Sequence, residues 1–183
     1  MSKLDEVIEK LMELDEDSLK ALLAIQEQQI ANATSRSVSV DSLDNLERTL
    51  IAQPRGGYDR ETINAGDRYL QNFNDQAYKL MCSDLFNDQD FKLKFLNASK
   101  ENSNQAAALL TQALTNYLKL GDPIAVITAV AIVKIVFSGV STIASATSTT
   151  ICDIWKSKVN EPEISNPQTS TTKTTPVDKA IEA

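Results

Sequence analysis

Few residues of this chain can carry out chemistry, and the absent ones are the more informative. The 183 residues include no histidine, so the usual general base, zinc ligand and pH switch is missing. Cys82 and Cys152 are too few and too far apart in sequence for a zinc knuckle. No disulfide framework is implied. Because Cys82 follows Met81 in an apolar run, we predict a buried, inert thiol there.

No other pattern points to catalysis, to a cofactor or to a metal ion. Asp84, Asp88 and Asp90 lie close together but lack the spacing and closing glutamate of a calcium loop, so a solvated loop explains them. The five glycines form neither a dinucleotide-binding fingerprint nor a P-loop. No carboxylate pair stands out as an acid–base couple. We therefore predict a protein that is not an enzyme, with no cofactor, no metal and no small-molecule substrate.

The arginines gather in one part of the chain, which favours a polar partner surface there. Guanidinium groups pair readily with carboxylates and are enriched at interfaces. The alternative is that they belong to ordinary solvated helix faces. Nucleic acid is excluded as a partner because the chain carries 18 Lys+Arg against 25 Asp+Glu. All five arginines lie between residues 36 and 68. Those predicted to face a partner are Arg48, Arg55, Arg60 and Arg68, and the fifth is Arg36.

A segment near the C-terminus, residues 124–143, has Lys134 as its only charge. About 20 apolar residues are enough to cross a bilayer. A central lysine costs about 2.5 to 3.5 kcal/mol, against roughly 3 to 6 kcal/mol gained by the strongly apolar side chains, so insertion is close to balanced. The residues expected to contact lipid or an assembly partner are Ile124, Val126, Ile127, Val130, Ile132, Val133, Lys134, Ile135, Val136, Phe137, Val140 and Ile143.

Aromatic and basic residues flank this apolar segment and suit the interface of a membrane. Tyr117 precedes it, and Trp155, Lys156 and Lys158 follow it. A straight helix from Tyr117 to Trp155 would be about 57 Å long, so at most one of the two groups can reach an interface.

Three interpretations of the apolar segment stay open. It can insert into or lie on a bilayer, or it can be the core helix of a soluble bundle with Lys134 at its exposed edge. It can also form buried strands, because β-branched residues dominate positions 124–136. Gly121-Asp122-Pro123 is a typical helix start and favours a helix, with Asp122 as the N-cap.

Helical periodicity covers most of the chain before this segment. Leu4, Val7, Ile8 and Leu11 recur at spacings of three and four, as on one face of an amphipathic helix. We predict Asp15 as the N-cap of a helix over 16–32, and Asp59 as the cap of the helix that follows the turn at 54–57. A further helix is expected over 102–120, and the pattern leaves the element over 91–96 undetermined.

The predicted fold class is all-α. A soluble body of about five helices spans 1–120, a long apolar C-terminal helix lies within 121–159, and a flexible Thr/Ser/Pro tail spans 160–183. The first residues alternate acidic and apolar side chains and do not form a signal peptide. The apolar segment predicts a membrane-associated protein. If the segment does not associate with a membrane, the expected location is the cytoplasm.

We expect a non-enzymatic, membrane-associated protein. It would be a structural component of a membrane-containing assembly, including a viral one, or a small membrane-perturbing effector. Its partners would be membrane lipid or an apolar protein surface, and further copies of the chain in a homo-oligomer or larger assembly. The alternative is a soluble helical module for protein–protein interaction, in which the apolar helix is the buried core.

Overall fold

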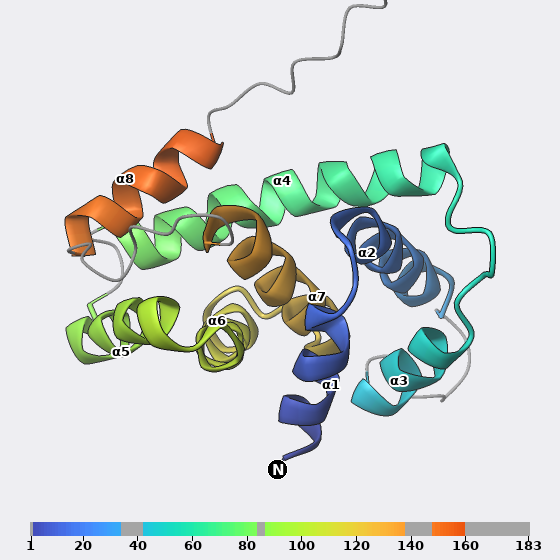
Figure 1. The fold of residues 1–183 in the computed structure, drawn as a ribbon, viewed down its shortest axis with the longest axis horizontal. Helices are drawn as coiled ribbons and strands as arrows, with labels where there is room; N and C mark the ends of the chain where they lie inside the picture. The colour runs from blue at the N-terminus through green and yellow to red at the C-terminus, as the bar shows by residue number, and fades with distance from the viewer. Residues whose placement is uncertain (1, 34–41, 84–86, 138–147, 160–183) are drawn as a thin grey trace, which may run out of the picture.

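The structure, a computed structural model, describes residues 2–33, 42–83, 87–137 and 148–159. All regular secondary structure in these ranges is helical, so the predicted all-α class is confirmed and the alternative of buried strands is wrong (Figure 1). The element over 91–96, whose type the sequence left undetermined, is part of a helix, α5. In chain order the elements are α1 (Lys3–Met12), α2 (Glu16–Asn32), α3 (Leu43–Ile51), α4 (Arg60–Cys82), α5 (Gln89–Glu101), α6 (Ser103–Tyr117), α7 (Asp122–Ile132), the π-helical segment η1 (Val133–Phe137) and α8 (Ser148–Val159).

Local capping sets where several helices begin. The Asp15 carboxylate accepts a hydrogen bond from the Ser18 backbone N–H at 2.7 Å, and Asp59 accepts one from Thr62 at 2.9 Å. Both predicted N-caps are confirmed. Hydrogen bonds from the side chain and then from the backbone N–H of Ser18 hold the pKa of Asp15 below its usual range, and those of Thr62 do the same for Asp59. The N-cap of α7 lies one residue earlier than predicted, because Gly121 occupies it without a side-chain bond.

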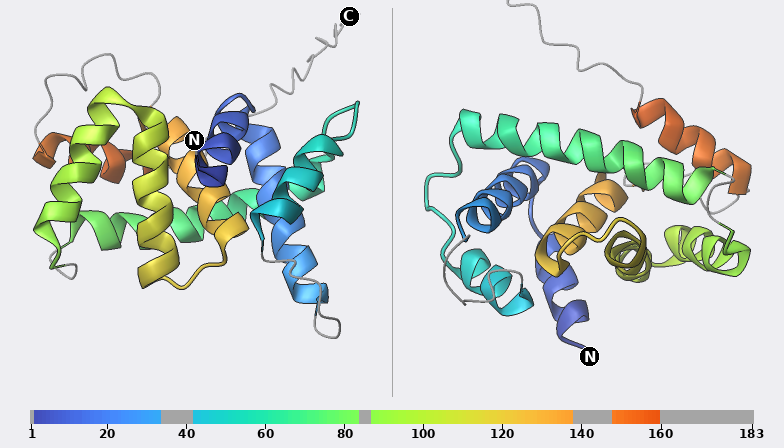
Figure 2. Two further views of the ribbon diagram at one scale, coloured as in Figure 1. Left: turned by 90° about the horizontal axis from the view of Figure 1, so that it is seen from below. Right: turned by 180° about the vertical axis from the view of Figure 1, so that it is seen from behind.

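The hydrophobic core is centred on α7. In two opposite views this helix runs through the middle of the molecule, with α1, α2, α4 and α6 around it (Figures 1 and 2). All ten residues of the run 123–132 are buried. A helix that is apolar on every side has to be covered on every side, and here other helices provide the cover.

The long apolar C-terminal helix predicted from the sequence is not shown within the described residues. The α-helix ends after 11 residues, at Ile132, and continues as the five-residue π-helical segment η1. Eleven residues span about 16 Å, roughly half the hydrocarbon thickness of a bilayer. No helix within the described ranges has the length and apolar content for crossing a membrane. Val140, Ile143 and the predicted tail over 160–183 lie outside the described residues.

Helices α2 and α4 pack against each other at a position where only glycine fits. A Cβ on Gly66 of α4 would lie 1.7 Å from the carbonyl oxygen of Lys20 in α2. The Lys20 side chain, 10% exposed, forms ion pairs with Glu16 at 2.8 Å and with Asp67 at 2.7 Å. Burial alone would lower the pKa of Lys20, but the hydrogen bonds to Asp67 and Glu16 outweigh burial and raise the pKa above its usual value. The close approach of the two backbones therefore places a charged, paired lysine at the helix crossing.

Replacing Gly66 by alanine should push α2 and α4 apart. We expect Gly66→Ala to lower the free energy of unfolding by at least about 2 kcal/mol, even after the roughly 1 kcal/mol that alanine gains in helix propensity. Urea denaturation followed by circular dichroism measures this change. Gly56→Ala is the matched control, since a Cβ there meets no atom within 4 Å, and it should change stability by less than about 0.5 kcal/mol. Equal stabilities of the two variants would contradict the close packing.

Candidate functional site

The lone charge of the apolar segment has a specific partner in the fold. The Lys134 ammonium donates hydrogen bonds to the carbonyl oxygen of Met12, at 2.8 Å, and to that of Leu14. Met12 is the last residue of α1, and the last carbonyls of a helix have no N–H partner within that helix. A cation also interacts favourably with the negative end of the helix macrodipole. Half-buried Lys134 therefore caps α1 from a position more than a hundred residues away in sequence.

The aromatic residue expected at a membrane interface lies in the protein interior instead. Trp155 of α8 is fully buried, and its ring centroid lies 5.9 Å from that of Phe137 and 6.0 Å from those of Tyr78 and Phe95. Its indole N–H donates a hydrogen bond to Asn74 Oδ1 at 2.7 Å. Since indole nitrogen needs a partner when it is buried, this bond fixes how α8 lies on α4.

The other flanking residues are on the surface. Tyr117, at the end of α6, is 50% exposed, and Lys156 and Lys158 of α8 are exposed. Of the apolar segment, Ile135 is only partly buried, whereas Phe137 is 7% exposed and Val133 and Val136 are almost completely covered.

The two cysteines are not the separate thiols that the sequence suggested. Cys82, the last residue of α4, forms a disulfide with Cys152 in α8, with a Cα–Cα distance of 5.7 Å. The prediction of an inert Cys82 thiol is therefore wrong. A cross-link over 70 residues removes unfolded-state entropy worth about 4 kcal/mol on the loop-closure model. Nothing in the local sequence signals this bond, because it depends on α8 returning to the end of α4.

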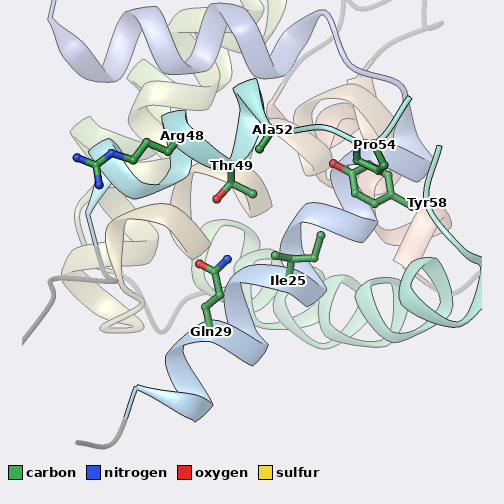
Figure 3. A pocket seen from close by; sticks show the side chains of 7 residues that line it. All are labelled: Ile25, Gln29, Arg48, Thr49, Ala52, Pro54 and Tyr58. Carbon is green, nitrogen blue, oxygen red and sulfur yellow. The ribbon is translucent and has the colours of Figure 1, made fainter. Parts of the chain in front are cut away.

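A groove lies between α2 and α3 (Figure 3), at the end of the molecule opposite α8 (Figure 1). Its volume is about 400 Å³. Helix α2 contributes Ile25 and Gln29, α3 contributes Arg48 and Thr49, and the segment after α3 contributes Ala52, Pro54 and Tyr58.

The walls of this groove, the α2–α3 groove, are held together by side-chain hydrogen bonds. Asn45 of α3 donates to Gln29 Oε1 at 2.9 Å, and the Gln26 amide donates to Thr49 Oγ1 at 3.3 Å. Next to the groove, at the end of α3, Ile51 is 80% exposed. The groove is therefore a preformed, mainly apolar depression with an unburied isoleucine beside it.

The predicted arginine surface lies partly along this groove. Arg48 lines it and points outward at its rim (Figure 3), Arg55 follows Pro54, and Arg60 begins α4. Arg68 lies two turns further along α4 and does not line the groove. All four are exposed, and none forms an ion pair within the described parts of the chain. Arg36 lies outside the described residues.

The residues that the structure describes contain no candidate metal site. There, no three His, Cys, Asp or Glu side chains are placed to hold a metal ion. Glu27 has its pKa raised by burial, but it lines neither the α2–α3 groove nor the cavity between Leu4 and Thr111. Comparison of the chain with protein-family models, with curated proteins and with solved structures found no match.

Removing the ammonium of Lys134 should weaken the fold. In Lys134→Met the carbonyls of Met12 and Leu14 lose a charged donor, and we expect the free energy of unfolding to fall by about 1 to 3 kcal/mol. Hydrogen exchange should accelerate first in α1. Lys94→Met is the control because Lys94 is exposed on α5, and it should be neutral within about 0.5 kcal/mol. A neutral Lys134→Met would mean that the cap contributes nothing to stability.

Proposed function

We propose that this protein is a non-enzymatic helical module for protein–protein interaction, with α7 as its core. The observation that carries the proposal is the complete burial of residues 123–132 by α1, α2, α4 and α6. An apolar helix that is already covered satisfies its hydrophobic surface within the chain. Binding would then use the outer surface, where a preformed groove and exposed arginines occur together.

The partner that fits the α2–α3 groove is an amphipathic helix with acidic flanks. The groove and the neighbouring Ile51 offer apolar surface to the apolar face of such a helix. Arg48 at the rim and Arg55 nearby offer guanidinium groups to carboxylates on its flanks. This positive rim on a chain of net charge −7 would select acidic partners locally.

Membrane association within a larger assembly, the first expectation from the sequence, is the second proposal. The apolar composition of 124–137 supports it. It requires α7 to leave its position between four helices and Lys134 to give up the carbonyls of Met12 and Leu14. This rearrangement would expose the apolar surfaces that now cover α7, so the second proposal carries a cost that the first does not.

Binding to the groove can be tested with two designed helical peptides that share one leucine face. One carries glutamates beside that face and the other carries lysines. We expect the acidic peptide to bind the full chain more tightly, with an affinity that falls as salt rises. Arg48→Glu should reduce this binding at least about tenfold, the loss of roughly 1.4 kcal/mol.

Ile51→Asp should also lower the affinity for the acidic peptide, whereas Leu93→Asp should leave this affinity unchanged. Leu93 is a matched control because it is 51% exposed but belongs to α5. Fluorescence anisotropy with labelled peptides measures all three variants. Equal affinity for both peptides, or equal loss in the Leu93 variant, would exclude the groove as the binding site.

The two proposals differ in what Lys134→Leu does. If α7 stays in the core, wild type and Lys134→Leu should both remain in the protein fractions when floated with vesicles of phosphatidylcholine and phosphatidylglycerol. If the segment inserts, Lys134→Leu should move into the lipid fraction, because the substitution removes the roughly 2.5 to 3.5 kcal/mol cost of a central lysine. Circular dichroism of the same samples checks that the variant is folded.

A further inference from the structure

Helix α8 packs against α4, α5 and η1. It lies at one end, across the C-terminal part of α4 and beside α5, away from α3 (Figures 1 and 2). In the described part of α8, the fully buried side chains are Ile151 and Trp155. The disulfide and the hydrogen bond from Trp155 to Asn74 join α8 to α4. Helix α8 is thus held by one covalent bond and by the buried side chains of Ile151 and Trp155, and its partly buried Ile154 and Val159 pack against the same core.

The disulfide is more open to solvent than the side chains beside it. Cys82 and Cys152 are both partly exposed, whereas Ile151 and Trp155 are fully buried. Thiol–disulfide exchange requires a thiolate to reach one of the two sulfurs. The partial exposure of both cysteines places the bond at the edge of the interface that it holds together, and there we expect a dithiol to reach it.

We propose that the Cys82–Cys152 disulfide is a site of thiol–disulfide exchange with a dithiol reductant, and that its reduction releases α8. A thiolate of the reductant attacks one sulfur, the S–S bond breaks, and a mixed disulfide forms. The second thiolate of the reductant then attacks the mixed disulfide. Two electrons pass to the protein, Cys82 and Cys152 take up protons and become thiols, and the dithiol becomes a disulfide.

Release of α8 follows from what remains after the bond is broken. Keeping the twelve residues of α8 ordered opposes the conformational entropy of each of them. Without the cross-link, only noncovalent contacts offset that entropy, chiefly those of Ile151 and Trp155 and the hydrogen bond to Asn74.

The surface uncovered by this release is aromatic. Phe95 and Phe137, which contact Trp155, would become accessible to water or to a partner. The core would stay closed, because the helices that cover α7 are α1, α2, α4 and α6, which the release of α8 would leave in place. Reduction would therefore open one end of the molecule without unfolding it.

The chain carries its own reporter for this event, because Trp155 is its single tryptophan. On reduction of the full chain with dithiothreitol, we expect its emission to move to longer wavelength and its quenching by acrylamide to increase. Amide exchange should accelerate at least about tenfold in 148–159 but stay slow in 122–132. Intact mass after alkylation counts the thiols in each sample, and reoxidation with glutathione disulfide should restore the initial state.

The double variant Cys82→Ser/Cys152→Ser separates loss of the bond from other effects of the reductant. It should resemble the reduced wild type in emission and exchange, and dithiothreitol should not change it. Identical tryptophan quenching in oxidised and reduced wild type would overturn the proposal. Loss of protection from amide exchange in 122–132 together with 148–159 would also overturn it, because the bond would then stabilise the whole fold. Two alkylatable thiols that do not reoxidise would also overturn it. The outcome is independent of peptide binding at the α2–α3 groove, because that groove lies at the opposite end of the molecule.

Discussion

Removing α7 from water is the constraint on which the rest of this structure depends. Ten consecutive residues of the helix are buried, so no stripe of its surface is left for solvent. A two-helix packing covers only one face, and a central apolar helix therefore needs neighbours on several sides. Here α1, α2, α4 and α6 supply them, although they come from separate parts of the chain. The order of the helices in space follows from this requirement.

The single cation of the apolar segment connects this core to the N-terminus. Inside a bilayer Lys134 would need to reach the headgroups, whereas here it reaches the open carbonyls at the end of α1. The same bonds satisfy two needs, because a half-buried ammonium requires acceptors and a helix C-terminus requires donors. The charge that made membrane insertion nearly balanced in sequence thus has a structural role in the folded chain.

The two ends of the molecule differ in how they are held. At the α3 end, neutral hydrogen bonds between α2 and α3 shape a groove, and exposed arginines remain around it. At the α8 end, a covalent bond and an aromatic cluster attach a short helix to the body. Noncovalent walls of fixed shape suit reversible binding of a partner. A covalent bond at the edge of an interface makes that interface depend on the thiol–disulfide balance of its surroundings.

The features that the sequence determined by itself are local. Asp15 and Asp59 were predicted as N-caps because a cap bonds a backbone N–H only three residues ahead. The all-α class follows from apolar spacings of three and four, and the need to keep residues 124–133 out of water follows from their composition. Capping and periodicity act within a few residues, so they can be read without knowing the fold.

Only the tertiary structure showed which helices cover residues 123–132 in the folded chain. The composition of this segment is equally compatible with lipid and with other helices, because both environments are apolar. The pairing of Cys82 with Cys152, the contact of Gly66 with Lys20 and the acceptors of Lys134 each join residues far apart in the chain. Such contacts leave no trace in local spacing, since they arise only when helices pack together.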